Sequence, residues 1–263
     1  MNNTAKRISL TGAFAALVVV LGITKLGMIP LGPTASITIL HVPVILICML
    51  SGLWEGCVVG AAFGIMSLIQ AAMSPSGVLD PMFTNPLVSV LPRVLLAVAA
   101  WALWKGLKWS FEKISKYKVF FRILMTVIAG VVAWIAVWTV VKGNEAIPYE
   151  WKINYTLIGI ACAGALVWNL VKSLPDVTNG ATAGVAAFLA TLVHTVMVIG
   201  SLYLFQPGVK EAMGGAGYGA VMVMLLPQAC LEATGAAIVC VAVMGAVQGT
   251  DSKKSKLSAE ADE

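Results

Sequence analysis

Apolar segments recur along almost the whole chain, and they constrain the fold more than any other feature of the sequence. Most are about 20 residues long, the length that a helix needs to cross the hydrocarbon core of a bilayer. Only 11% of the residues are charged, against about 25% in a soluble domain. Because backbone polar groups inside a bilayer must be bonded within the protein, the sequence predicts an all-α polytopic membrane protein.

We predict eight spans in one transmembrane domain over residues 1–248, followed by a disordered charged cytoplasmic tail over 249–263. The second span is short for a hydrocarbon core of about 30 Å, so we expect it to be buried among its neighbours or tilted. Residues 105–118 predict an amphipathic basic helix that contacts membrane lipid or, as the alternative, a cytoplasmic partner. The predicted spans are residues 9–28, 41–54, 57–73, 85–104, 120–141, 153–174, 181–205 and 220–247.

The basic residues predict the orientation of these spans. Of the 17 Lys and Arg residues, twelve lie on the side of the two termini, three lie on the opposite side and two lie within spans. By the positive-inside rule both termini are therefore cytoplasmic, in a multi-pass protein of the cell membrane. The loops at 29–40 and 74–84 then face outwards. The three outward residues are Lys142, Lys152 and Lys210, and the two within spans are Lys25 and Arg93.

Arg93 is the polar residue that most needs an explanation. It follows Asn85 and Pro86, which together form a good helix start, and lies roughly 12 Å further along the span at 1.5 Å per residue. A charge at that depth needs a partner, a cavity or a ligand. Two interpretations stay open. Arg93 either pairs with Glu232 or with carbonyls of a broken helix, or its guanidinium binds a ligand's carboxylate or phosphate.

Other polar side chains in or near the spans are candidates for the same site. Lys25 is expected on the outer half, as Arg93 is, and two cations near an outward cavity favour a small anionic ligand. Lys25 could instead extend to the membrane surface, and a histidine within a span is often a helix-packing residue. The candidate substrate-binding residues are Arg93, Asn85, Lys25, His41, His194, Gln228 and Glu232.

The sequence offers little for catalysis or metal binding. It contains no H-E-x-x-H, Walker or G-x-S-x-G motif, and its five cysteines form no Cys-x-x-Cys pair, so we expect neither an enzyme nor a resident cofactor or metal. The basic residues lie at membrane edges, which argues against nucleic acid as a partner. Without an ATPase motif, uphill transport would need a partner or a coupling ion.

The first span carries a stripe of small residues at helical spacing, formed by Ser9, Gly12, Ala13 and Ala16. Such a stripe lets another helix approach closely in lipid. It fits contact with a partner subunit or internal packing equally well.

Several of these segments together resemble the substrate-binding S component of energy-coupling factor (ECF) vitamin transporters. They are the small-residue stripe, ITIL-His41-Val-Pro43, the NPLVSVLPR segment ending at Arg93, the run ATLVHTVMVIG ending at Gly200, and PQACLE ending at Glu232. The resemblance covers residues 8–108 and 180–247. It implies a six-helix core interrupted by an extra hairpin at 119–174, and NPLVSVLPR is most like the pantothenate-type branch.

The resemblance further implies a high-affinity vitamin-binding subunit of an ATP-driven importer. Its partners would be a transmembrane coupling subunit, packed on Gly12 and Ala16, and two ATPase subunits. Arg93 would hold the carboxylate of pantothenate, although folate also carries carboxylates. The alternatives are a stand-alone ion-coupled transporter of a small organic anion, or a membrane enzyme or assembly factor.

Overall fold

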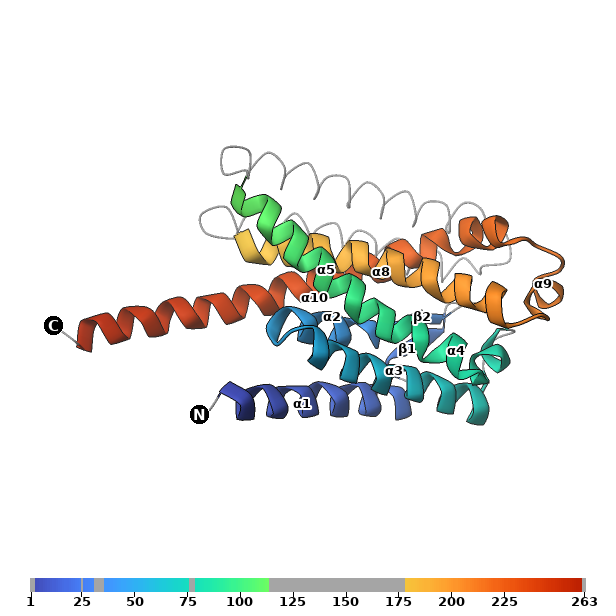
Figure 1. The fold of residues 1–263 in the computed structure, drawn as a ribbon, viewed down its shortest axis with the longest axis horizontal. Helices are drawn as coiled ribbons and strands as arrows, with labels where there is room; N and C mark the ends of the chain where they lie inside the picture. Colours follow the sequence, from blue (N-terminus) through green and yellow to red (C-terminus); the bar gives the residue numbers. More distant parts are fainter. Residues whose placement is uncertain (1–2, 25, 31–35, 76–78, 114–177, 262–263) are drawn as a thin grey trace, which may run out of the picture.

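The computed structural model describes residues 3–24, 26–30, 36–75, 79–113 and 178–261. Within these ranges the chain is a bundle of helices joined by short elements (Figure 1). In chain order the elements are α1 (Asn3–Ile23), β1 (Met28–Pro30), β2 (Ser36–Thr38), α2 (His41–Leu50), α3 (Leu53–Met73), η1 (Asp80–Thr84), α4 (Pro86–Ser89), α5 (Leu91–Lys113), α8 (Thr178–Phe205), α9 (Val209–Ala212) and α10 (Tyr218–Ala261).

The prediction of a polytopic helical membrane protein is confirmed. Five segments of the described residues are long and apolar enough to cross a bilayer, and they correspond to five predicted spans. The short α2 corresponds to a sixth. The other two predicted spans, at 120–141 and 153–174, lie outside the described residues, so the number eight stays a prediction. The five segments are Thr4–Ile23, Leu53–Met73, Pro86–Ser110, Thr182–Phe205 and Gln228–Val247.

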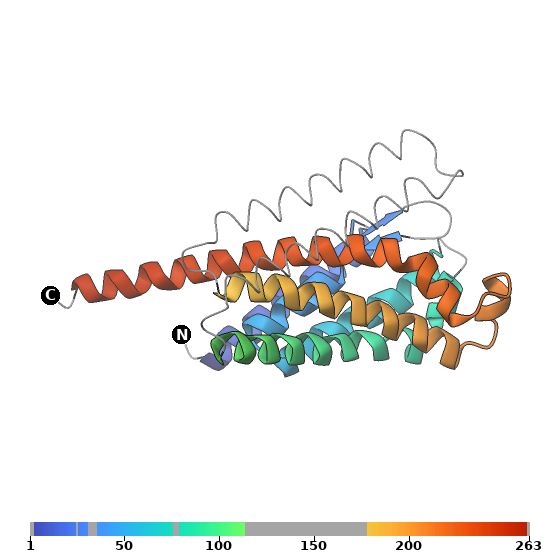
Figure 2. The same cartoon turned by 90° about the horizontal axis from the view of Figure 1, so that it is seen from above.

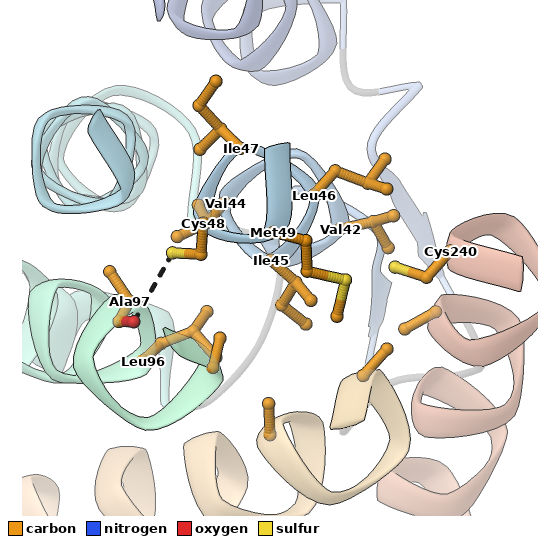
Figure 3. Close-up of a cluster of buried hydrophobic side chains, with 14 of the residues drawn as sticks. Val42, Val44, Ile45, Leu46, Ile47, Cys48, Met49, Leu96, Ala97 and Cys240 are labelled. Carbon is orange, nitrogen blue, oxygen red and sulfur yellow. Dashed lines mark hydrogen bonds between the residues drawn. The ribbon is translucent and has the colours of Figure 1, made fainter. Parts of the chain in front are cut away.

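Helix α2 lies in the middle of the bundle. Its ten residues extend only about 15 Å, and nine of them are buried. Figure 3 shows α2 surrounded by other helices, with the Cys48 Sγ donating to the carbonyl of Ala97 at 3.4 Å. Because its neighbours cover it on all sides, α2 does not need the length of a lipid-exposed span. Burial among neighbours, one of the two predicted explanations for its shortness, is confirmed.

Helices α3 and α5 approach each other closely through two glycines of α3. A Cβ atom at Gly60 would lie 2.6 Å from the backbone oxygen of Arg93, and one at Gly64 would lie 2.6 Å from the Cα of Val90. No side chain fits in that space. This contact places the face of α3 that carries Phe63 and Ser67 directly against the start of α5.

One loop and one span differ from the elements that the sequence predicts. The outer loop at 29–40 contributes an antiparallel pair of strands, with Ile29 opposite Ile37, so the prediction of an all-α chain is wrong in this detail. The alternating Ser36-Ile37-Thr38-Ile39 segment has the β propensity that could have indicated a strand. The predicted span at 85–104 is also not one helix, because it divides into α4 and α5 at Val90.

Two helices continue where the sequence predicts a change. Residues 105–113 extend α5 without a break instead of starting a separate surface helix, and residues 114–118 lie outside the described part. The tail predicted to be disordered continues α10 as far as Ala261. No Gly or Pro follows Gly249, and adding residues to an existing helix is far easier than nucleating a new one.

The two chain ends lie at the same end of the bundle, with α10 extending beyond the other helices (Figures 1 and 2). At this end Arg7 of α1 forms an ion pair with Glu55 of α3, at 2.6 Å. The opposite end carries η1, α4 and α9. The shared position of the ends agrees with an even number of spans, whereas the side of the membrane on which they lie stays a prediction.

We predict that Gly60→Ala lowers the melting temperature of the detergent-solubilised chain by several degrees. The new methyl group would overlap the α5 backbone, and overpacking of this kind costs about 1–3 kcal/mol. Gly12→Ala is the matched control, because a Cβ there meets nothing within 4 Å. Fluorimetric thermal unfolding measures both variants, and equal melting temperatures would contradict the close contact between α3 and α5.

Candidate functional site

The break between α4 and α5 positions Arg93. Asn85 caps α4, its side-chain oxygen accepting from the Leu87 N–H at 3.0 Å. In a continuous helix the carbonyl of Val88 would accept from residue 92, but Pro92 has no N–H to donate. The carbonyl instead accepts a hydrogen bond of 2.8 Å from Nη1 of Arg93. The proline that interrupts the helix therefore also provides a partner for the buried cation.

The rest of the guanidinium lies between polar and aromatic side chains. Nη2 donates to the Ser67 hydroxyl at 3.3 Å, and the guanidinium carbon lies 5.3 Å and 5.0 Å from the ring centroids of Phe63 and Phe83. Both distances are within the range of a cation–π interaction. The hydroxyl of Ser89 donates to the carbonyl of Phe83 and so fastens η1 to α4.

Arg93 is only 6% exposed, and its Nε has no hydrogen-bond partner among the described residues. Within the same ranges it makes no ion pair at 4.0 Å or less with a carboxylate. Of the two predicted structural roles, pairing with a broken-helix carbonyl is therefore present and direct pairing with Glu232 is not. A carbonyl and a hydroxyl bond the guanidinium but do not neutralise its charge.

Two histidines from different helices meet next to this cation. The rings of His41, at the start of α2, and His194, in α8, are stacked with centroids 6.1 Å apart and planes 22° apart. Phe63 lies 6.0 Å from the His194 ring and thus touches both the histidine pair and Arg93. The histidines are 1% and 8% exposed, and the Nε2 atom of each has no partner within the described part of the chain.

Glu232 in α10 completes the cluster and links it to the strand pair. Its Oε1 accepts from the backbone N–H of Thr38 in β2 at 2.7 Å and from Nε2 of Gln228 at 3.3 Å. The carboxylate therefore holds β2 against α10, and the Thr38 N–H that it binds lies three residues before His41 of the histidine pair.

Five of the seven candidate residues come together in the described part of the chain. Asn85 uses its side-chain oxygen to cap α4, and Lys25 lies outside the described residues. Sequence reasoning missed Phe63 and Ser67, although their spacing of four residues within a glycine-rich helix was a usable signal. It also missed Phe83 of η1 and Thr38 of β2, which lie in segments that the sequence predicts to be loops. The five that come together are Arg93, His41, His194, Gln228 and Glu232.

The arrangement is equipped to bind rather than to catalyse. Three nitrogen atoms have no partner among the described residues, namely Nε of Arg93, which can donate to an acidic group, and Nε2 of His41 and of His194. Among the described residues, no group of three His, Cys, Asp or Glu side chains could hold a metal ion. A small anion with further hydrogen-bonding groups matches this set of side chains.

The small-residue stripe of α1 lies away from this cluster. Ser9, Gly12, Ala13 and Ala16 are all exposed, and nothing lies within 4 Å of a Cβ placed at Gly12. The stripe therefore does not pack inside the described part of the bundle. Of the two predicted interpretations, an outward contact surface fits this position and internal packing does not.

The described fold is that of a multi-pass helical membrane protein. Residues 6–175 match the model of the family described as "ECF transporter, substrate-specific component", and the chain belongs to this family. This is a family of transport components and not of enzymes.

A curated relative is the "Pantothenate transporter PanT" of Leuconostoc mesenteroides subsp. mesenteroides. The two chains are 33% identical over 101 residues, which cover 37% of this chain and 50% of that protein. The chain therefore spans about half the length of this relative. The likeness agrees with the pantothenate-type branch that the sequence indicates.

Proposed function

We propose that the chain is the vitamin-binding subunit of an ATP-driven ECF importer in the cell membrane and that its substrate is pantothenate. Membership of the ECF substrate-specific components supports a role in vitamin uptake. The relative named as a pantothenate transporter supports the choice of vitamin. The cluster around Arg93 supplies a buried cation for the ligand's carboxylate and further polar side chains for its other groups.

The observation that carries the proposal is the state of Arg93. Removing a charge from water costs several kcal/mol unless an opposite charge and hydrogen bonds compensate. Here the guanidinium is buried with a neutral carbonyl, a neutral hydroxyl and two aromatic rings, and its Nε has no partner among the described residues. A ligand carboxylate would give the guanidinium an opposite charge in direct contact and an acceptor for its Nε, which gives binding a large favourable term.

Pantothenate matches the cluster at more than one point. It has a carboxylate for Arg93, and it has hydroxyl and amide groups that can bond to unpartnered imidazole nitrogens. His194, stacked on His41, and the guanidinium of Arg93 both lie against Phe63, so we propose that one small molecule bonds to all three side chains. Lys25 stays a further candidate on the outer half of the span.

We predict that excess pantothenate raises the melting temperature of the detergent-solubilised chain. A tight ligand at 1,000-fold excess over its Kd stabilises the folded state by about 4 kcal/mol. Arg93→Ala should remove this shift, and Arg93→Lys should weaken binding at least about tenfold because it keeps the charge but loses the planar fork.

Arg7→Ala is the matched control for this test, since Arg7 pairs with Glu55 at the other end of the bundle. Its melting temperature should still rise with pantothenate. A wild-type chain that no vitamin stabilises would contradict the proposal. So would an Arg93→Ala variant that keeps the full shift.

The outward stripe of α1 is the proposed contact for the transmembrane coupling subunit, which would connect the chain to two ATPase subunits. Membership of the family supports such partners, and exposed small residues allow close helix approach in lipid. Both termini are proposed to be cytoplasmic, on the side where those ATPases would act.

Gly12→Trp and Ala16→Trp should leave pantothenate binding unchanged and stop ATP-dependent uptake, because a bulky side chain would separate the two subunits. Leu204→Trp is the control, since Leu204 is exposed on a different helix, α8. Uptake of labelled pantothenate with and without coexpressed ECF subunits measures the effect. Equal uptake without those subunits would favour the ion-coupled alternative.

A further inference from the structure

Glu232 has a feature that holding the strand pair does not explain. Both of its hydrogen bonds, from Thr38 and Gln228, end on Oε1. Among the described residues Oε2 accepts none. The residue is half-buried, and its partner Thr38 lies three residues before His41, which stacks on His194. One oxygen therefore fixes the carboxylate in place, and the other is left as an acceptor beside the cluster.

The cluster is consequently polar from one end to the other. Arg93 supplies a positive charge, the two neutral imidazoles supply nitrogen atoms, and Glu232 supplies a carboxylate with an acceptor oxygen. An acid that enters this site has its carboxylate attracted to Arg93 and repelled from Glu232. The part of the ligand that faces Glu232 must then carry a hydrogen-bond donor, because an acceptor or a second anion there meets like charge.

From this geometry, and resting on the proposed function, we propose that Glu232 is a specificity-determining residue. Its Oε2 accepts a hydrogen bond from a hydroxyl or amide group of a ligand whose carboxylate Arg93 holds. The site therefore selects hydroxylated or amide-bearing acids with a single negative charge, and it rejects an acid that carries a second anionic group at the far end. Pantothenate meets this rule, whereas its phosphate monoester, 4′-phosphopantothenate, does not.

The role is testable because a purely structural Glu232 would not change the choice between these two ligands. Calorimetric titration of the full-length wild-type chain in detergent should give at least tenfold tighter binding of pantothenate than of 4′-phosphopantothenate. Glu232→Gln keeps a side-chain oxygen for the Thr38 N–H but removes the charge. It should reduce that preference at least tenfold, chiefly by admitting the phosphate ester.

Glu55→Gln is the matched control, because it makes the same change at the opposite end of the bundle, where Glu55 pairs with Arg7. It should leave the preference unchanged, and Glu232→Asp, which keeps the charge, should retain most of it. A Glu232→Gln preference equal to that of the wild type would overturn the inference while leaving the proposed function intact.

The wild-type measurement tests the inference even if Glu232→Gln does not fold. Equal wild-type affinity for the two ligands would overturn the specificity rule alone. Binding of neither ligand would contradict the proposed function and the inference with it.

Discussion

The hydrogen bond between Arg93 and the carbonyl of Val88 is the interaction on which the candidate site depends. Pro92 removes the N–H that would otherwise use this carbonyl, and the carbonyl then bonds to the guanidinium at 2.8 Å. The bond fixes the side chain within the bundle while leaving its Nε without a partner in the described residues. A single local defect in the helix thus both fixes the cation and leaves it able to bind an acid.

The surrounding bundle makes this arrangement possible by bringing distant segments together. Helix α2 is short and fully enclosed, so His41 at its first turn lies inside the protein beside His194 of α8. The close approach of α3 to α5 at Gly60 places Phe63 against the guanidinium. These residues come from different elements of the chain, and only their meeting produces a polar site.

Sequence reasoning was strongest where the physics is local. Hydrophobic length located the five long apolar helices and α2, and the Asn85-Pro86 pair correctly marked a helix start with Asn85 as its cap. It failed where one element continues or interrupts another. The tail after Gly249 extends α10 because nothing stops an existing helix, and Val90 divides a span that hydropathy alone treats as continuous.

The sequence by itself determined that this chain lies in a membrane, that a buried arginine needs a partner, and which few polar residues could supply one. Those conclusions follow from the cost of placing charge and backbone polar groups in hydrocarbon. Only the tertiary structure decided that Val88 and Ser67, and not Glu232, bond to Arg93, and that Glu232 holds β2 instead. Such choices depend on helix packing distances of a few ångströms, which no residue pattern along the chain encodes.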